Sequence, residues 1–133
     1  MLDSGAIICL LVIHFAGDFL FQSDWMACNK SKNWRALSAH VGIYTATLFV
    51  GCTLLLFLYG GTMGTMFPLL LVYALGNGLM HLFVDAISSQ ATSYIYERSR
   101  HWFFVLVGLD QLVHQACLIM SLGWMANRLA GLH

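Results

Sequence analysis

Long apolar stretches separated by short polar ones run through the whole chain. The apolar stretches cover residues 5–22, 36–59, 68–87 and 102–125, and each has about the 20 residues that cross a bilayer as a helix. Backbone polar groups in hydrocarbon must be satisfied within their own segment, so helices are the expected elements. The pattern predicts an all-α chain, a four-helix transmembrane bundle that forms a single domain over residues 1–133.

Composition supports this interpretation and narrows the partners. Hydrophobic residues make up 59% of the chain and charged residues only 9%, against about 25% charged in soluble domains, and the formal net charge is zero. We therefore expect the lipid bilayer as partner and no nucleic acid, since no basic run exists. Four such short helices could also require a homo-oligomer to enclose a site.

The polar connections fix the expected orientation. They cover residues 23–35, 60–66 and 88–100, and Pro68 suits the first turn of the third span. Cationic residues mark cytoplasmic loops, and the second connection has none. The first and third connections carry five basic residues: Lys30, Lys32, Arg35, Arg98 and Arg100. Both termini should therefore be non-cytoplasmic, with Arg128 alone opposing the bias.

Ionisable residues occur inside every span, and most come in pairs. Residues four apart on a helix share a face, so each of three pairs points in one direction. The pairs are His14 with Asp18, His81 with Asp85, and Asp110 with His114, and the second span contributes His40.

Depth along the helices tests whether these residues form one cluster. Counted from the cytoplasmic helix ends at 1.5 Å per residue, Asp85 lies about 3 Å deep, Asp18 about 6 Å and Asp110 about 12 Å. Only His114, at about 18 Å, falls outside the cytoplasmic half. The sequence predicts one cluster opening toward the cytoplasm, and a fourth helix that started a few residues later would fit best.

A buried carboxylate or imidazole must pair, bind a cation or meet water. Nitrogen and carboxylate donors suit a divalent transition metal, zinc first, with manganese or iron as alternatives, and a leftover Asp or His would take protons. The candidate metal ligands are His14, Asp18, His40, His81, Asp85, Asp110 and His114. The three aspartates, Asp18, Asp85 and Asp110, are also the candidate catalytic residues.

Four further residues are candidates for substrate binding or for supporting the ligands. Lys30 could meet a phosphate or an anionic headgroup, or serve only as a topology determinant. Gln22 could support the ligands or cap its helix, and Tyr44 could donate a proton or simply pack. Gln111 completes the set beside Asp110.

The motifs together resemble a family of small bacterial and phage integral-membrane proteins known only as a domain of unknown function. The resemblance rests on HxxGDFxxQ from His14 to Gln22, the downstream Lys30, LxxHxxxY from Leu37 to Tyr44, HxxxD from His81 to Asp85, and DQxxH from Asp110 to His114. It covers nearly the whole chain and implies a multi-pass protein of the bacterial inner membrane. The family often has a lysine where this chain has Ser88, so any role of that lysine is lost or moved here.

The favoured hypothesis is a metal-dependent hydrolase that acts on a lipid or phosphoester at the cytoplasmic side. Membrane-bound metal-dependent hydrolases with His and Asp in their helices offer an analogy. Two alternatives stay open: a proton or metal-ion transporter or channel, and a non-catalytic, holin-like or accessory membrane scaffold whose polar network is structural.

Overall fold

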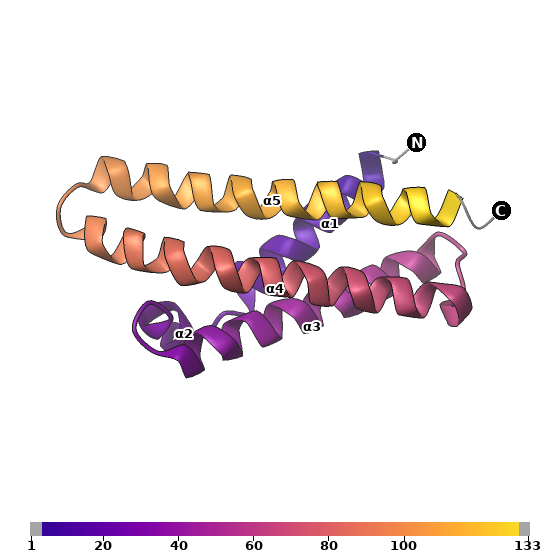
Figure 1. The fold of residues 1–133 in the computed structure, drawn as a ribbon, viewed down its shortest axis with the longest axis horizontal. Helices are drawn as coiled ribbons and strands as arrows, with labels where there is room; N and C mark the ends of the chain where they lie inside the picture. The colour runs from indigo at the N-terminus through magenta and orange to yellow at the C-terminus, as the bar shows by residue number, and fades with distance from the viewer. Residues whose placement is uncertain (1–3, 131–133) are drawn as a thin grey trace.

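The structure is a computed structural model that describes residues 4–130, and it is all-helical over that part of the chain, as predicted (Figure 1). The elements in order are α1 (Ser4–Phe15), the π-helical turn η1 (Ala16–Leu20), α2 (Asp24–Asn29), α3 (Trp34–Leu58), α4 (Met63–Tyr96) and α5 (Arg100–Ala130).

Three of these helices contain stretches long and apolar enough to cross a membrane. They are Trp34–Leu58, Met66–Tyr96 and Arg100–Arg128, with mean hydropathies of 2.1, 1.7 and 1.7. Ser4–Leu20 forms a shorter apolar helical stretch of about 26 Å at 1.5 Å per residue, slightly less than the hydrocarbon core. The chain therefore has the character of a membrane protein.

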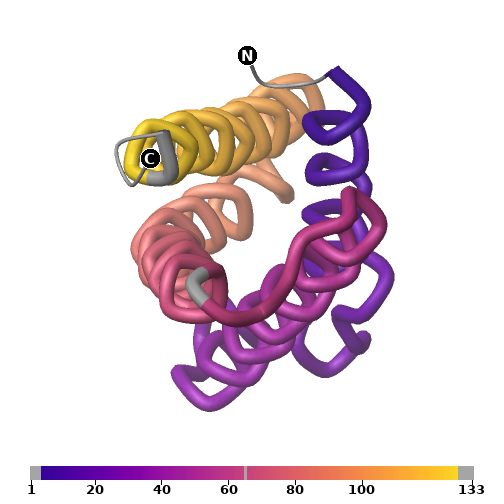
Figure 2. The backbone as a smooth tube through the Cα atoms, turned by 90° about the vertical axis from the view of Figure 1, so that its right-hand side faces the viewer, coloured from indigo at the N-terminus to yellow at the C-terminus, as the bar shows by residue number. Residues whose placement is uncertain are grey.

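The long helices lie around a common centre when viewed along the long axis of the molecule (Figure 2). Helices α4 and α5 form an antiparallel hairpin that spans the full length, α3 packs on α4, and α1 packs mainly on α3 (Figure 1). The α2 segment and the α4–α5 connection lie toward one end of the molecule, and the α3–α4 connection lies at the other.

Polarity is inverted relative to a soluble bundle. Large apolar side chains cover the outside, among them Leu58 at 81%, Met120 at 76% and Ile87 at 73% exposure. Among the described residues, eight polar side chains are buried instead: His14, Asp18, His40, Asn77, His81, Asp85, Ser89 and His114. This arrangement suits an apolar solvent outside and a polar site within.

The prediction of a connection over residues 88–100 is wrong for most of its length, because α4 continues to Tyr96 and α5 begins at Arg100. Side chains in this stretch bond back to the helix itself: Gln90 Nε2 donates to Ala86 O and Thr92 Oγ1 to Ser88 O, both at 2.8 Å. A polar sequence thus continues the helix.

Two smaller expectations also need correction. Pro68 lies inside α4 rather than in its first turn, since Gly60, with φ of 75°, turns the chain early and the helix begins at Met63. The connection over residues 23–35 contains α2, whose N-terminus is capped by Ser23 Oγ, which accepts a hydrogen bond from the Met26 backbone at 3.4 Å.

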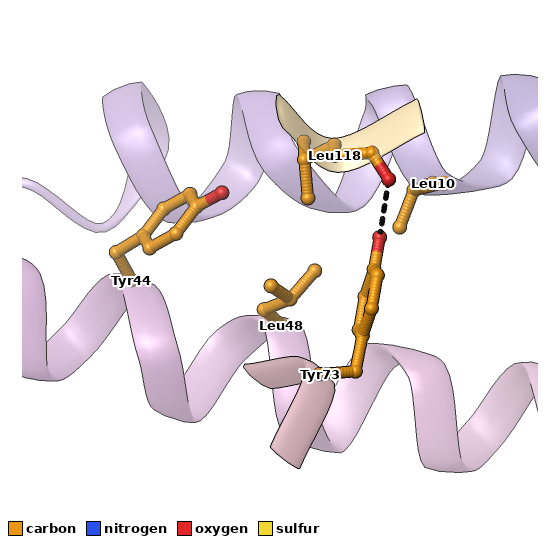
Figure 3. Close-up of a cluster of buried hydrophobic side chains, with 5 residues drawn as sticks. All are labelled: Leu10, Tyr44, Leu48, Tyr73 and Leu118. Atoms are coloured by element: carbon orange, nitrogen blue, oxygen red, sulfur yellow. Dashed lines mark hydrogen bonds between the residues drawn. The ribbon is translucent and has the colours of Figure 1, made fainter. Parts of the chain in front are cut away.

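The apolar core lies on the side of the buried polar residues away from α2. It consists of Leu10, Tyr44, Leu48, Tyr73 and Leu118 (Figure 3). The Tyr73 hydroxyl donates to the Leu118 carbonyl at 3.1 Å, so even its polar atom is satisfied within this core. The core separates the buried His and Asp residues from the end of the molecule at which α3 joins α4.

Candidate metal centre

Four side chains from three elements converge at the centre of the bundle. Asp18 comes from η1, His40 from α3, and His81 with Asp85 from α4. His40 Nε2 lies 3.0 Å from His81 Nε2, 3.1 Å from Asp18 Oδ1 and 3.2 Å from Asp85 Oδ2. His81 Nε2 lies 3.4 Å and 3.7 Å from the same two carboxylate oxygens. These four buried groups could hold a metal ion, and we call them the first group.

Hydrogen bonds alone satisfy the first group poorly. An imidazole Nε2 carries at most one hydrogen, yet His40 Nε2 faces three polar atoms within 3.2 Å. Asp18 and Asp85 are 3% and 1% exposed, so water contributes little to balancing their charges. A cation between the four atoms would satisfy all of them at once.

A second group lies next to the first and shares one residue with it. It consists of Asp85, Asp110 and His114, each of which offers one ligand atom within 4.8 Å of the others. His114 Nε2 lies 3.5 Å from Asp85 Oδ1.

The contact between His114 and Asp85 contradicts the small depth predicted for Asp85. That prediction assumed that α4 ends at residue 87. Because α4 runs to Tyr96, Asp85 lies eleven residues from its helix end and Asp110 ten residues from the start of α5, about 16 Å and 15 Å. The two helices therefore place their residues at equal depth without a later start for α5.

The π-helical turn aims Asp18 at the first group. The Phe21 N–H donates to Ala16 O, five residues back, at 2.9 Å. Such a widened turn changes the angle around the helix axis between residues four apart, here His14 and Asp18. Asp18 Oδ2 lies 4.0 Å from His14 Nε2, and Asp18 Oδ1 faces His40 and His81. Short π segments of this kind frequently occur at functional sites.

His14 was expected as a ligand, but the structure places it outside both groups. Its Nε2–H donates to Gln111 Oε1 at 3.2 Å, and its Nδ1 faces the Tyr44 hydroxyl at 3.4 Å. Gln111 Nε2 in turn donates to Asp18 Oδ2 at 2.7 Å. His14 therefore contacts Asp18 through Gln111 and belongs to neither group.

Tyr44 also packs against the ligands directly. Its ring stacks on His81 with centroids 4.0 Å apart and an interplanar angle of 13°. The His81 ring also contacts the His114 ring, with centroids 4.1 Å apart. These ring contacts hold the orientation of the His81 imidazole.

Lys30 and a cavity connect the first group to the α2 end of the molecule. Lys30 Nζ donates to Asp85 Oδ2 at 2.8 Å. The cavity has a volume of about 670 Å³, and Asp18, Asp110, Gln22 and Lys30 line it. Gln22 Oε1 is buried there and has no hydrogen-bond partner within residues 4–130.

Sequence reasoning missed part of the cavity wall. Further polar residues line it, among them Lys32, Ser88, Ser89, Thr92, Ser93 and Glu97. A signal for three of them existed, because positions 88, 89 and 92 follow Asp85 at helical spacings of three, four and seven and so continue its face. Interpreting residues 88–100 as a connection concealed it.

The fold and the buried groups define the class of the protein. It is an all-helical protein with membrane-spanning character and a buried His/Asp cluster that could hold a metal ion. The chain matches the family described as "Protein of unknown function (DUF3307)" over residues 6–130 and belongs to that family. No curated protein and no solved structure matches it.

Proposed function

We propose that the chain is a metal-dependent hydrolase of the bacterial inner membrane, with a fourth span formed by α1 and η1 and with the α2 end facing the cytoplasm. The observation that carries the proposal is the convergence of the first group, Asp18, His40, His81 and Asp85, beside a cavity at that end.

The spacing of the four atoms supports a small divalent ion. Ligands at about 2.0–2.2 Å from a tetrahedral ion lie about 3.3–3.6 Å from each other. The five separations given above range from 3.0 to 3.7 Å and straddle that value. Two imidazole nitrogens and two carboxylate oxygens without thiolate favour zinc, with manganese or iron as alternatives.

The cavity supports a substrate that carries both an anionic and an apolar part. Lys30 and Lys32 line it together with Phe103, Phe104 and Val107. A divalent ion in the site would supply Lewis acidity, which polarises a phosphoryl or carbonyl oxygen. The lysines would attract and orient an anionic group, and the apolar wall would accept a hydrocarbon chain. A lipid phosphoester combines both features.

The apolar core argues against the transport alternative. Leu10, Leu48, Tyr73 and Leu118 pack on the far side of the first group (Figure 3). The polar pair beside them, Asn77 and Ser121, is hydrogen-bonded within itself and to backbone carbonyls. A second cavity, of about 170 Å³, borders this core at the opposite end, but its lining is almost entirely apolar. A polar cavity at the α2 end alone suits an enzyme that admits and releases its substrate from one side.

Metal content and hydrolysis test the proposal together. The full chain is purified in detergent without chelator, incubated with Zn²⁺ and washed, beside His40→Ala and His81→Ala. We expect bound zinc in the wild type, and hydrolysis of phosphatidic acid in mixed micelles that is lost after chelation and restored by Zn²⁺. His101→Ala, an exposed histidine on α5, serves as the matched control. Equal zinc content in the wild type and both site variants would contradict the proposed metal site. Bound zinc without hydrolysis of a phosphoester or acyl-ester lipid would contradict the proposed hydrolase activity.

A further inference from the structure

Eight buried side-chain nitrogen or oxygen atoms have no hydrogen-bond partner among the described residues, and three of these, one from each residue of the second group, are possible ligand atoms there. They are Asp85 Oδ1, Asp110 Oδ1 and His114 Nε2. Buried polar atoms in native proteins are nearly always paired, and an unpaired one calls for an explanation such as a bound ion. All three belong to the second group, whose members offer ligand atoms within 4.8 Å of one another.

The two oxygens of Asp85 point to different groups. Oδ2 lies 3.2 Å from His40 Nε2 in the first group, whereas Oδ1 lies 3.5 Å from His114 Nε2 in the second. A carboxylate that faces two ligand sets with its two oxygens has the arrangement needed to bridge two ions.

We propose that Asp85, Asp110 and His114 form a second divalent-cation site, and that the Asp85 carboxylate bridges it to the first. This inference rests on the proposed function, because it adds an ion to the metal centre proposed there. Pairs of ions about 3.5–4 Å apart are typical of enzymes that cleave phosphoesters. The second site therefore narrows the substrate class from lipids or phosphoesters in general to phosphoesters.

The charge of the site accommodates a second ion when an anionic substrate is bound. Asp18, Asp85 and Asp110 bring three formal negative charges, and Lys30 brings one positive charge by its contact with Asp85. One divalent ion would balance the remainder, and a second would leave two positive charges. A phosphate group entering the cavity would neutralise these two positive charges. Without it they would be buried uncompensated, which costs free energy.

The second site also lies where a substrate could reach it. Asp110 lines the cavity directly, as Asp18 does from the first group, while Asp85 and His114 are 1% and 3% exposed. Each ion would thus have one ligand that lines the cavity, Asp18 or Asp110, and its other ligands would be buried.

Manganese binding to the full chain in detergent tests the proposal without relying on activity. The protein is stripped with chelator and titrated with Mn²⁺, and the bound metal is counted and its electron paramagnetic resonance spectrum recorded. We expect two Mn²⁺ per chain with the exchange-coupled spectrum of a bridged pair. Asp110→Asn and His114→Ala should each bind half as much Mn²⁺ and show the uncoupled spectrum of a single ion.

Matched controls and distinct outcomes separate the two proposals. Asp24→Asn and His101→Ala change exposed residues of the same types and should keep both ions. Thermal unfolding of the metal-free variants identifies any that are misfolded, and His114→Ala tests the site independently of Asp110→Asn. If the wild type and both site variants bind one Mn²⁺ with equal affinity, the second site is wrong and the first stands. If the wild type binds none, both are wrong.

Discussion

The ammonium group of Lys30 takes part of the place that a metal ion would fill. It donates to Asp85 Oδ2 at 2.8 Å, and its side chain is 19% exposed. We predict that Lys30→Met destabilises the metal-free protein by about 1–3 kcal/mol, between the costs of breaking an exposed and a buried ion pair. A bound cation supplies the missing charge, so saturating Zn²⁺ should remove most of this loss. Thermal unfolding with and without Zn²⁺ measures both effects.

Lys32→Met provides the control for the Lys30 prediction. Lys32 lines the same cavity and carries the same charge, but it is exposed and has no ion pair with Asp85. Its replacement should leave the metal-free stability within about 0.5 kcal/mol of the wild type. Equal destabilisation by both replacements would show that the general charge of the cavity matters, and not the contact between Lys30 and Asp85.

At the scale of the elements, the π-helical turn depends on the absence of a side chain at Gly17. A Cβ there would lie 3.3 Å from both Tyr44 Cδ2 and Thr47 Cβ, closer than an ordinary contact. Tyr44 stacks on His81, so a push on its ring reaches a candidate ligand. We predict that Gly17→Ala weakens zinc binding about tenfold, as changes to the supports of metal ligands commonly do. Competition with a chromophoric chelator measures the affinity.

Gly42→Ala is the matched replacement for Gly17→Ala. A Cβ at Gly42 would meet nothing within 4 Å, and the residue lies within α3. Alanine is the better helix former, so this variant should keep its zinc affinity and gain slightly in stability. Unchanged zinc affinity in Gly17→Ala would mean that the bundle absorbs the methyl group without moving Tyr44.

The elements differ in how far the sequence alone could predict them. Hydropathy predicted the three helices that are long and apolar enough to cross a membrane and the shorter apolar one before them, because burial in lipid acts on whole segments. It placed the end of the third stretch at residue 87, whereas α4 ends at Tyr96. Hydropathy reports where a chain leaves hydrocarbon, and a helix such as α4 continues wherever its polar side chains can bond to its own backbone, as Thr92 does.

The sequence could predict which residues gather in the candidate site, but not which of them contact one another. Helical spacing and depth predicted that Asp18, His40, His81 and Asp85 belong to one cluster, and in the structure they lie side by side. The exclusion of His14 was not foreseeable, because it depends on a widened turn and on the contact with Gln111 from the far end of the chain. Neither feature leaves a periodic trace in the sequence.

At the scale of the whole molecule, charge and cavity give the same orientation. Lys30, Lys32, Arg35, Arg98 and Arg100 belong to the segments at the end that holds α2 and the α4–α5 connection, while Arg128 lies near the end of α5 (Figure 1). Since basic loops stay in the cytoplasm, the cavity should open to that side.

Cysteine labelling checks this orientation. Cys28 is exposed on α2 and lines the cavity, and it can be kept alone in a variant with Cys9→Ser, Cys52→Ser and Cys117→Ser. We predict that a membrane-impermeant maleimide labels Cys28 in inverted membrane vesicles and not in right-side-out vesicles or intact cells. With Cys28→Ser added, Arg128→Cys should show the opposite pattern. Labelling of Cys28 from outside would reverse the orientation and require the substrate to come from the outer side of the membrane, and the metal centre itself would be unaffected.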